Sequence, residues 1–433
     1  MRLRTSILCI MAGTTISHAG PLTQSPAGHQ IHNRQCFSPD GRFIYYDSRN
    51  DETQLALSHT IGRVEISTRR EEILHHSGNI PIGAVTCHPL EPKLAFILGI
   101  PGLSYAPQLR SGATLDPDNN PIRLDARDVT PPFTAGTLRG GTHAFHWSPS
   151  GAHVSFTYND ALTPSKTAPH DLRTIGILIP GFPIKITNPS SPLDFNGTAT
   201  TCLVVPVTPN PRPGSNDLLR AFDEDWIDDH TLAFQGTIKT STGTLITELF
   251  LATIPTNPLN HLPSSENTAA TMPATLGGTT IRRLTNTENT THPGIQGPRH
   301  WVRTSPDRKS IAYLAKDTNG VVQIQRASID GSKVSQITRL TQSIQDVFDW
   351  SPDGKHLACI AGNQLLLINA STGLATPITD PAPPSLSPRY AAVFSPDGKS
   401  IATNCPTPHP DGHTYLQIHI FPLKSNELNH PSE

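Results

Sequence analysis

Alternating runs of apolar and polar residues recur along the chain, and each run follows a turn-forming tetrapeptide. In its clearest form, at 38–41, 351–354 and 395–398, an aromatic residue is followed by Ser-Pro-Asp-Gly and then by alternating side chains. Proline fixes the second turn position, glycine accepts positive φ, and a period of two is that of a half-buried strand. Each copy therefore predicts a β-hairpin. The seven copies begin at Phe37, Cys87, Trp147, Trp226, Thr304, Trp350 and Phe394.

The repetition determines the predicted fold. A lone hairpin cannot bury both faces, whereas blades repeated around an axis pack face to face. Residues 328–338 and 369–379 share a second pattern, a glycine turn and then a strand ending in Ile-Thr, which completes a four-stranded blade. The shortest intervals between turns match one blade of about 40–50 residues. We expect an all-β propeller of seven four-stranded blades, with six or eight also compatible, because a sandwich of unrelated hairpins would not repeat one tetrapeptide.

The longer intervals between turns predict insertions within a single domain. We expect residues 20–433 to form one propeller, with insertions near 187–226 and 256–280. The first alternates proline-rich stretches with a strand-like run, and 215–226 is interpreted as a short capped helix with solvated acidic residues at 223–225. The second is rich in Asn, Thr, Pro and Ser and is expected to be an exposed loop.

The N-terminus predicts export. Arg2 and Arg4 precede a short apolar stretch at 7–12, and Ser-His-Ala at 17–19 forms a cleavage site, so residues 1–19 are interpreted as a signal peptide of a periplasmic or secreted protein. No later segment approaches the roughly 18 apolar residues that cross a bilayer. With 33 basic and 35 acidic residues, no overall positive field favours nucleic acid. We expect a monomer without a membrane span.

Five cysteines remain after the predicted cleavage, and they form neither a C-x-x-C pair nor a zinc-finger spacing. A dense disulfide framework is excluded. One or two disulfide bridges remain possible, and the odd number of cysteines leaves at least one free thiol. Most of the five are expected to be buried as small apolar side chains. These cysteines are Cys36, Cys87, Cys202, Cys359 and Cys405.

The chain resembles one broad group of known proteins and, within that group, one closer family. The alternating hairpins resemble the TolB-like propellers of the bacterial periplasm, and nearly the whole mature chain is similar to the YidR-type family of such propellers. The passages that carry the closer likeness are Gly28-His-Gln, Leu138-Arg-Gly-Gly-Thr-His, Val154-Ser-Phe-Thr-Tyr-Asn-Asp, Asp171-Leu-Arg-Thr-Ile-Gly, Pro213-Gly-Ser and Pro298-Arg-His-Trp-Val-Arg. The resemblance implies a propeller and carries over no catalytic residue, because a fold does not determine an activity.

Candidate chemistry lies where innermost strands converge on the central channel. Four residues before the aromatic position stand Asn33, His143, His300, Asp346 and Tyr390, and one residue before it stand Cys36, His146, Asp225, Arg303 and Asp349. Strand alternation allows only some of them to face the channel. The aromatic residues themselves, which include Trp147, are expected in the core between blades. The candidate ligand-binding residues are His32, Asn33, His143, His146, Arg299, His300, Arg303 and Asp346.

Two functions remain. The first is a non-enzymatic binding or scaffold protein that recognises a protein or an envelope glycan at the channel mouth. The second is a carbohydrate-active lyase or hydrolase that uses the channel histidines, with a divalent metal, if one is present, on His143, His146 and His300. This second function has a general similarity to oligogalacturonate lyases. No G-x-S-x-G, Walker or H-E-x-x-H motif occurs, which favours the binding protein.

Overall fold

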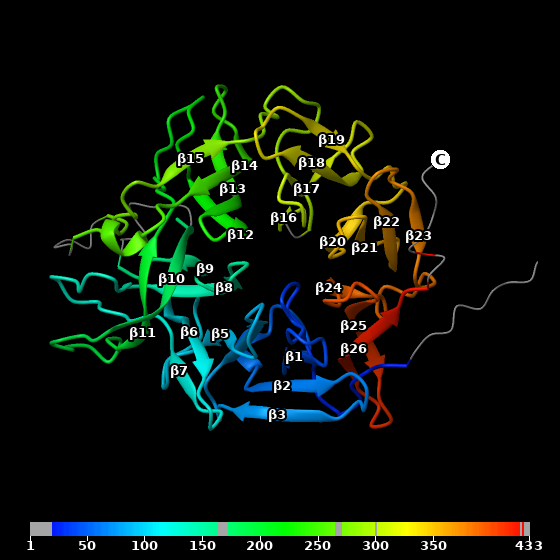
Figure 1. Cartoon of the computed structure of the whole chain (residues 1–433), viewed down its shortest axis with the longest axis horizontal. Helices are drawn as coiled ribbons and strands as arrows, with labels where there is room; N and C mark the ends of the chain where they lie inside the picture. The colour runs from blue at the N-terminus through cyan, green and yellow to red at the C-terminus, as the bar shows by residue number, and fades with distance from the viewer. Residues whose placement is uncertain (1–19, 163–171, 265–270, 299–300, 425–426, 428–433) are drawn as a thin grey trace, which may run out of the picture.

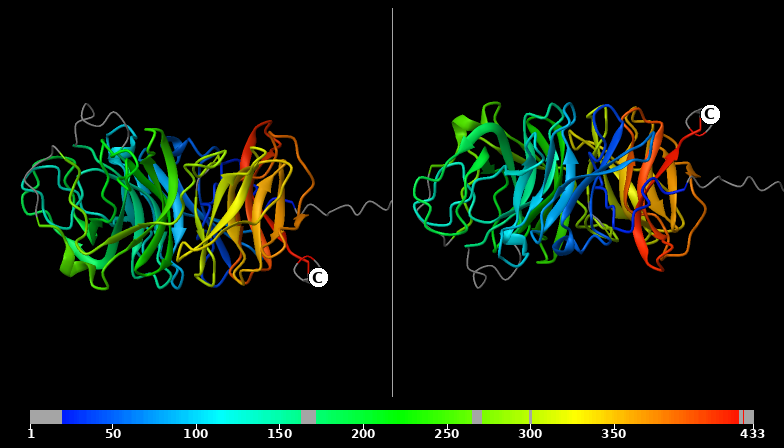
Figure 2. Two further views of the ribbon diagram at one scale, coloured as in Figure 1. Left: turned by 90° about the horizontal axis from the view of Figure 1, so that it is seen from above. Right: turned by 90° about the horizontal axis from the view of Figure 1, so that it is seen from below.

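The computed structural model describes residues 20–162, 172–264, 271–298, 301–424 and 427, and it shows seven antiparallel sheets arranged as a ring (Figure 1). Seen from the side, the ring is a disc with the strands of each sheet crossing its thickness (Figure 2). The predicted seven-bladed β-propeller is therefore confirmed. The predicted signal peptide, residues 1–19, lies outside the described residues.

The blades follow one another in chain order. Blade 1 contains β1 (Phe43–Asp47), β2 (Thr60–Glu65) and β3 (Glu71–His76); blade 2 contains β4 (Ile82–Cys87), β5 (Leu94–Leu98), β6 (Ser111–Leu115) and β7 (Pro121–Arg123). Blade 3 contains β8 (Gly141–Trp147), β9 (Val154–Asn159), β10 (Thr174–Ile184) and β11 (Gly197–Leu203); blade 4 contains β12 (Arg220–Asp228), β13 (Thr231–Lys239), β14 (Leu245–Thr253) and β15 (Thr280–Arg283).

The remaining three blades have the same order from the channel outward. Blade 5 contains β16 (Arg303–Thr304), β17 (Ser310–Lys316), β18 (Val322–Ser328) and β19 (Val334–Gln336); blade 6 contains β20 (Ile344–Trp350), β21 (His356–Ala361), β22 (Gln364–Asn369) and β23 (Ala375–Pro377); blade 7 contains β24 (Arg389–Phe394), β25 (Ser400–Pro408) and β26 (Thr414–Pro422). Three short 3-10 helices lie in the connections: η1 (Leu55–Leu57), η2 (Pro107–Leu109) and η3 (Pro258–His261).

The N-terminal residues complete the first and last blades. Residues 30–37 take the innermost position of blade 1, where Gln30 and Phe37 bridge to β1. Just before them, the amide of Leu22 donates to the carbonyl of Ile418 at 2.7 Å, and the amide of His29 donates to Leu416 at 2.8 Å. Residues 22–29 thus cover the outer edge of β26 and close the ring, which leaves that edge strand with main-chain partners.

The Ser-Pro-Asp-Gly turns share one hydrogen-bond pattern. In the first, the Ser38 hydroxyl donates to the Asp40 carboxylate at 2.6 Å and accepts from the amide of Phe43 at 2.9 Å. Ser351 and Ser395 repeat both contacts in blades 6 and 7. The turn glycine has positive φ, +68° at Gly41, a conformation that glycine adopts without steric cost.

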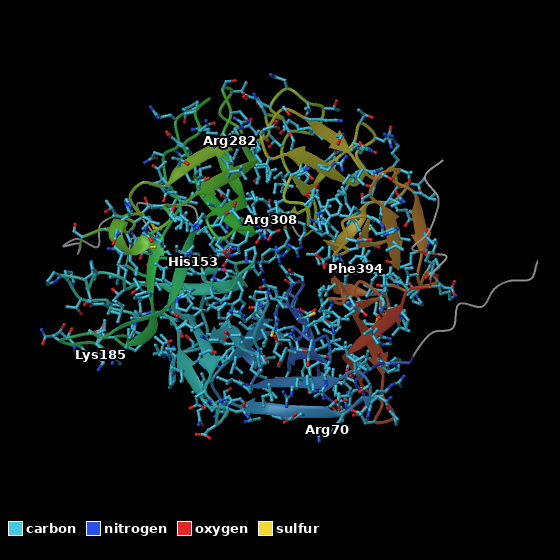
Figure 3. The ribbon with its side chains drawn as sticks, viewed as in Figure 1. Arg70, His153, Lys185, Arg282, Arg308 and Phe394 are labelled. Carbon is cyan, nitrogen blue, oxygen red and sulfur yellow. The ribbon has the colours of Figure 1, made fainter. Side chains whose placement is uncertain are left out.

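The aromatic residues before the turns lie between blades, as predicted. Trp147 and Trp226 are 1% and 2% exposed, and Phe37, Trp350 and Phe394 are also buried in apolar clusters. Figure 3 places Phe394 inside the ring, with charged side chains such as Arg70 and Lys185 at the rim. The blades therefore adhere through these apolar faces.

The predicted helix at 215–226 is wrong. Residues 220–228 form β12, the innermost strand of blade 4, and Glu224 and Asp225 are fully buried rather than solvated. The local sequence has acidic residues typical of a helix end, but pairing of β12 with β13 overrides this weak preference. In the second predicted insertion, η3 and the start of β15 fall within 256–280, and residues 265–270 lie outside the described residues.

The five cysteines at 36, 87, 202, 359 and 405 are all buried and free, in line with the expected role as small apolar side chains. Among the described residues, no helix is long and apolar enough to cross a membrane.

Candidate functional site

Bulges in the innermost strands decide which side chains face the channel. In β4, β8 and β12 the register shifts just before the last residues of the strand, and Ala84, Ala144 and Asp223 there have φ of +56°, +59° and +51°. Each of the three lies three positions before the first residue of its repeat, which is Cys87, Trp147 or Trp226. A bulge interrupts strand alternation, so residues on both sides of it are redirected toward the channel. Two levels of polar side chains result.

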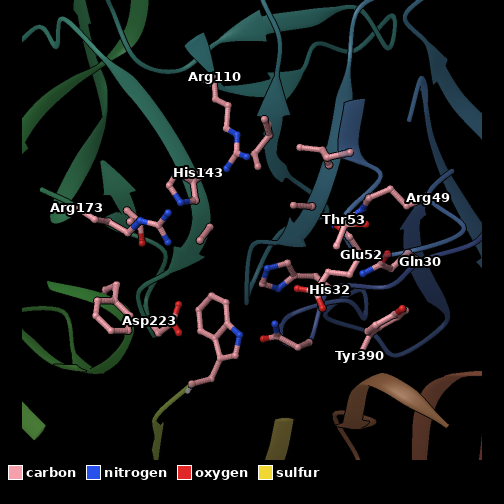
Figure 4. Close-up of a pocket in the computed structure, with 18 of the residues that line it drawn as sticks. Gln30, His32, Arg49, Glu52, Thr53, Arg110, His143, Arg173, Asp223 and Tyr390 are labelled. Carbon is pink, nitrogen blue, oxygen red and sulfur yellow. The ribbon is translucent and has the colours of Figure 1, made fainter. Parts of the chain in front are cut away.

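The upper level is a cavity of about 790 Å³ at the channel mouth (Figure 4). Blades 1 to 4 supply most of its wall, and Trp301 and Tyr390 extend the wall into blades 5 and 7. In Figure 4, Arg110, His143, Arg173 and Asp223 lie on one side of the cavity, opposite Arg49, Glu52 and Thr53.

Four arginines line this cavity, one from each of four consecutive blades. Arg49 lies in the β1–β2 connection of blade 1, Arg110 in the β5–β6 connection of blade 2 and Arg173 in the β9–β10 connection of blade 3. Arg220 begins β12 in blade 4. The lining described here also contains two carboxylates, Glu52 and Asp223. A chain with a formal net charge of -2 therefore carries an excess of positive side chains at this mouth.

The arginine planes are oriented by neighbouring groups. Asp47, beneath the cavity, accepts two hydrogen bonds of 2.7 Å from the Arg49 guanidinium. The Arg110 guanidinium lies 4.8 Å from the centre of the Tyr105 ring, and that of Arg220 lies 5.5 Å from the Phe222 ring. A planar guanidinium held in this way presents a fixed set of donors, which suits carboxylate or phosphate oxygens.

His143 stands at the back of the cavity as a neutral imidazole. Burial, followed by the nearby positive charges of Arg110 and Arg173, holds its pKa well below the usual value. The same two charges would repel a divalent cation at this ring. The position therefore suits a neutral hydrogen-bonding group beside a bound anion better than a metal ligand.

Asp223 is half-buried in the cavity wall and faces the arginines. Burial raises its pKa to about 6, although Arg173, Arg303 and Arg220 all act in the opposite direction. The next residue, Glu224, is fully buried, and burial raises its pKa to about 7. Two carboxyl groups at this strand bend thus titrate near neutral pH, whereas ordinary carboxyl groups titrate near 4.

The lower level is a buried ionic network that joins blades. Arg34 is ion-paired with Asp225, and Arg303 donates to Asn33 at 2.8 Å and lies 4.0 Å from the Asp349 carboxylate. Asp225 and Asp349 also accept main-chain hydrogen bonds from the next blade, from Thr304 at 2.6 Å and from Phe394 at 3.3 Å. These contacts account for most of the polar groups and indicate a structural role.

His146 belongs to the lower level as well. Its Nδ1 lies 3.2 Å from the carbonyl of Glu224, and its ring packs 5.2 Å from His32 and 5.0 Å from Trp301. Burial and the nearby positive groups keep its pKa well below the usual value. His143 and His146 therefore occupy different levels of the channel.

The structure separates the predicted site residues into groups. His32, Asn33 and His143 line the mouth cavity, and His146 and Arg303 lie below it. Asp346 bonds to the amide of Tyr390 in the next blade, a contact between blades 6 and 7. Arg299 and His300 lie outside the described residues. Within the described ranges, no group of three or more His, Cys, Asp or Glu is arranged to hold a metal ion, and the trio with His300 stays a prediction.

Sequence reasoning missed the residues that dominate the cavity. Arg49, Arg110 and Arg173 stand in loops of different lengths, so they share no fixed offset from the repeat and were not selected. Asp223 was assigned to a helix end. The one available signal was Arg173, which lies within the quoted passage at 171–176.

Comparison with known proteins gives one family and a fold. A family model described as a protein of unknown function (DUF3748) matches residues 81–191. The uncharacterized protein YidR of Escherichia coli (strain K12) is 34% identical over 391 residues, which cover 88% of this chain and 93% of that protein.

Among solved structures, an oligogalacturonate lyase in complex with manganese is 11% identical with a TM-score of 0.55, covering 93% of this chain and 92% of its own. The oligogalacturonate lyase of Vibrio parahaemolyticus is also 11% identical, with a TM-score of 0.51, and 94% of each chain is covered. At this identity the likeness shows a shared propeller fold.

Proposed function

The chain belongs to the YidR family of β-propellers, and from that premise we propose that it is a non-enzymatic binding protein whose channel mouth holds an anionic ligand, an acidic segment of an envelope glycan. The observation that carries this proposal is the row of four arginines, one per blade from blade 1 to blade 4, around one cavity of about 790 Å³. Guanidinium groups converging on a concave site select oxyanions by charge and by paired hydrogen bonds.

The shape and composition of the cavity favour a glycan over a protein partner. A concave site of several hundred cubic ångströms encloses a small or chain-like ligand, whereas protein partners cover broader surfaces. Tyr105, Trp301 and Tyr390 add aromatic surface to the arginine lining. Aromatic faces suit the apolar faces of sugar rings, and the arginines suit their carboxylates. The expected export to the periplasm or beyond would bring such a glycan within reach.

Calorimetric titration of the purified protein with trigalacturonate, and with neutral maltotriose as the uncharged control, tests the proposal. We expect binding of the acidic trisaccharide alone, with affinity that falls as salt is added. The triple substitution of Arg110, Arg173 and Arg220 by Ala should abolish binding. Arg70→Ala on the outer rim, where the side chain is 71% exposed, removes one arginine charge far from the cavity and should leave binding intact. Equal binding of both sugars, or no loss in the triple variant, would refute the proposal.

A carbohydrate-active lyase or hydrolase is the second candidate, and Asp223 is the observation that favours it. A half-buried carboxyl group with a pKa of about 6 in a cavity is suited to accept or donate a proton near neutral pH. Chromatography of trigalacturonate after long incubation distinguishes the two functions. Shortened products that disappear with Asp223→Asn would support the enzyme, and an intact trisaccharide that still binds supports the binding protein.

A further inference from the structure

Asp223 is an acidic residue in the centre of the basic wall. Its carboxylate faces positive groups from three blades: Arg173 from the β9–β10 loop, Arg220 from the start of its own strand, and Arg303 from β16. The other acidic group close to it is Glu224 on the same strand. Asp223 shares the cavity wall with Arg173 and Arg220, and its negative charge offsets theirs across the cavity.

The backbone holds Asp223 in place at a steric cost. Its φ of +51° lies in the left-handed region, and it sits in the bulge where the register of β12 shifts between Phe222 and Asp225. Asp and Asn enter this region more readily than most residues, but single residues held there remain strained. In a regular strand, successive side chains point to opposite faces of the sheet. The bulge interrupts this alternation, and the Asp223 side chain points into the cavity.

We propose that Asp223 is an internal counter-ion of the arginine-lined cavity in the free protein, so that an acidic ligand entering beside Arg173 and Arg220 replaces its charge and binds together with one proton. This inference rests on the proposed function and identifies how the same site is regulated. Two carboxylates cannot share the arginines without repulsion, and the protein relieves that repulsion by protonating Asp223. The proton comes from solvent, and the neutral carboxyl group then donates a hydrogen bond to the ligand instead of repelling it.

The pH dependence follows from the charge balance. Burial raises the pKa of Asp223 to about 6, so the free protein carries a carboxylate there above that pH and a neutral carboxyl group below it. Binding above pH 6 takes up as much as one proton, and affinity then falls by up to about tenfold for each further pH unit. His143 does not contribute, because burial and two arginines hold its pKa well below the usual value. The uronate carboxylates of the probe titrate near 3.5 and stay ionised throughout.

The test is titration calorimetry of the full mature chain with trigalacturonate between pH 5 and pH 8.5, in two buffers of different ionisation enthalpy. The wild type should take up close to one proton at pH 8 and lose affinity with rising pH. Asp223→Asn keeps the left-handed conformation accessible while removing the charge, so it should bind at least about tenfold tighter at pH 8. Its proton uptake and pH dependence should fall to the part contributed by Glu224, whose pKa burial raises to about 7.

Two further variants keep the result interpretable. Asp223→Gly accepts the same φ and should behave like Asp223→Asn if the first variant folds poorly. Asp118→Asn, at an exposed position in the β6–β7 hairpin, changes the net charge equally and should leave affinity and its pH dependence unchanged. If the wild type binds but Asp223→Asn shows the same affinity and proton uptake, the counter-ion role is refuted and the proposed function stands. If neither protein binds trigalacturonate at any pH, both are refuted.

Discussion

The indole nitrogen of Trp226 donates a hydrogen bond to the main-chain carbonyl of His146, 3.0 Å away across the boundary between blades 4 and 3. Trp350 makes the equivalent contact with the carbonyl of Arg303 in blade 5, at 3.3 Å. The aromatic residue before the turn therefore joins neighbouring blades by a polar bond as well as by apolar packing.

Replacing Trp226 should separate these two contributions. Trp226→Phe removes the hydrogen bond to the buried carbonyl of His146. We therefore expect a loss of about 2 kcal/mol in the free energy of unfolding. Trp147→Phe is the matched control, because the Trp147 indole nitrogen has no hydrogen-bond partner among the described residues. Denaturant titration of both variants measures the difference. Equal losses would show that the bond contributes nothing.

Turn glycines should differ in their tolerance of a methyl group. Gly151 has φ of +78°, and a Cβ there would overlap the His88 ring of the preceding blade, whereas Gly412, at +87°, faces open space. Gly412→Ala should cost about 1 kcal/mol from backbone strain alone. Gly151→Ala should cost roughly 2–4 kcal/mol, because the His88 ring must also move. Thermal unfolding of the two variants checks this, and similar melting temperatures would contradict it.

Closure of the ring should depend on acid pH through Glu71. Partial burial opposes ionisation of this carboxylate, but hydrogen bonds from His29, Ser25 and the amide of Gln24 together hold its pKa at about 2. Because the folded pKa lies below the unfolded value near 4.5, the carboxylate stabilises the fold above pH 4.5 and loses this effect as pH falls toward 2.

Glu71→Gln should therefore be less stable than the wild type at pH 7, and the difference should shrink steadily between pH 4.5 and pH 2. Urea titration across this range measures it. The matched control is Glu91→Gln, which removes an exposed carboxylate in the turn between β4 and β5. A difference that grows on acidification would contradict the assignment of Glu71 to the N-terminal closure.

The five buried cysteines should be unreactive in the folded protein. Burial raises the pKa of the Cys87, Cys202, Cys359 and Cys405 thiols to about 12 and raises that of Cys36 as well, so thiolate is scarce at pH 8. Maleimide should label none of the five within minutes under native conditions and all five in guanidinium. Rapid native labelling of any one, or a bridge detected by mass spectrometry, would contradict the buried free state.

The candidate site was only partly accessible to prediction. His143 was found because innermost strands repeat at a constant offset from the turn, and that offset survives in the sequence. Arg49 and Arg110 could not be found in this way, because residues in loops of different lengths have no constant offset from the turn. Asp223 was misassigned because three consecutive acidic residues are usually solvated, and burial of such a group among arginines is a property of the folded ring.

The sequence by itself determined the repeating unit, a turn followed by an alternating strand, which occurs seven times and is preceded by an aromatic residue in five of the seven copies. A hairpin that buries one face needs a neighbour, and repetition therefore leads to a closed ring of blades. Only the tertiary structure decided which loops meet over the channel mouth. Ring closure brings Arg49 and Arg220 to one cavity from distant parts of the chain, and bulges decide which strand residues join them. Strand period is a local property, whereas convergence on an axis is a property of the whole ring.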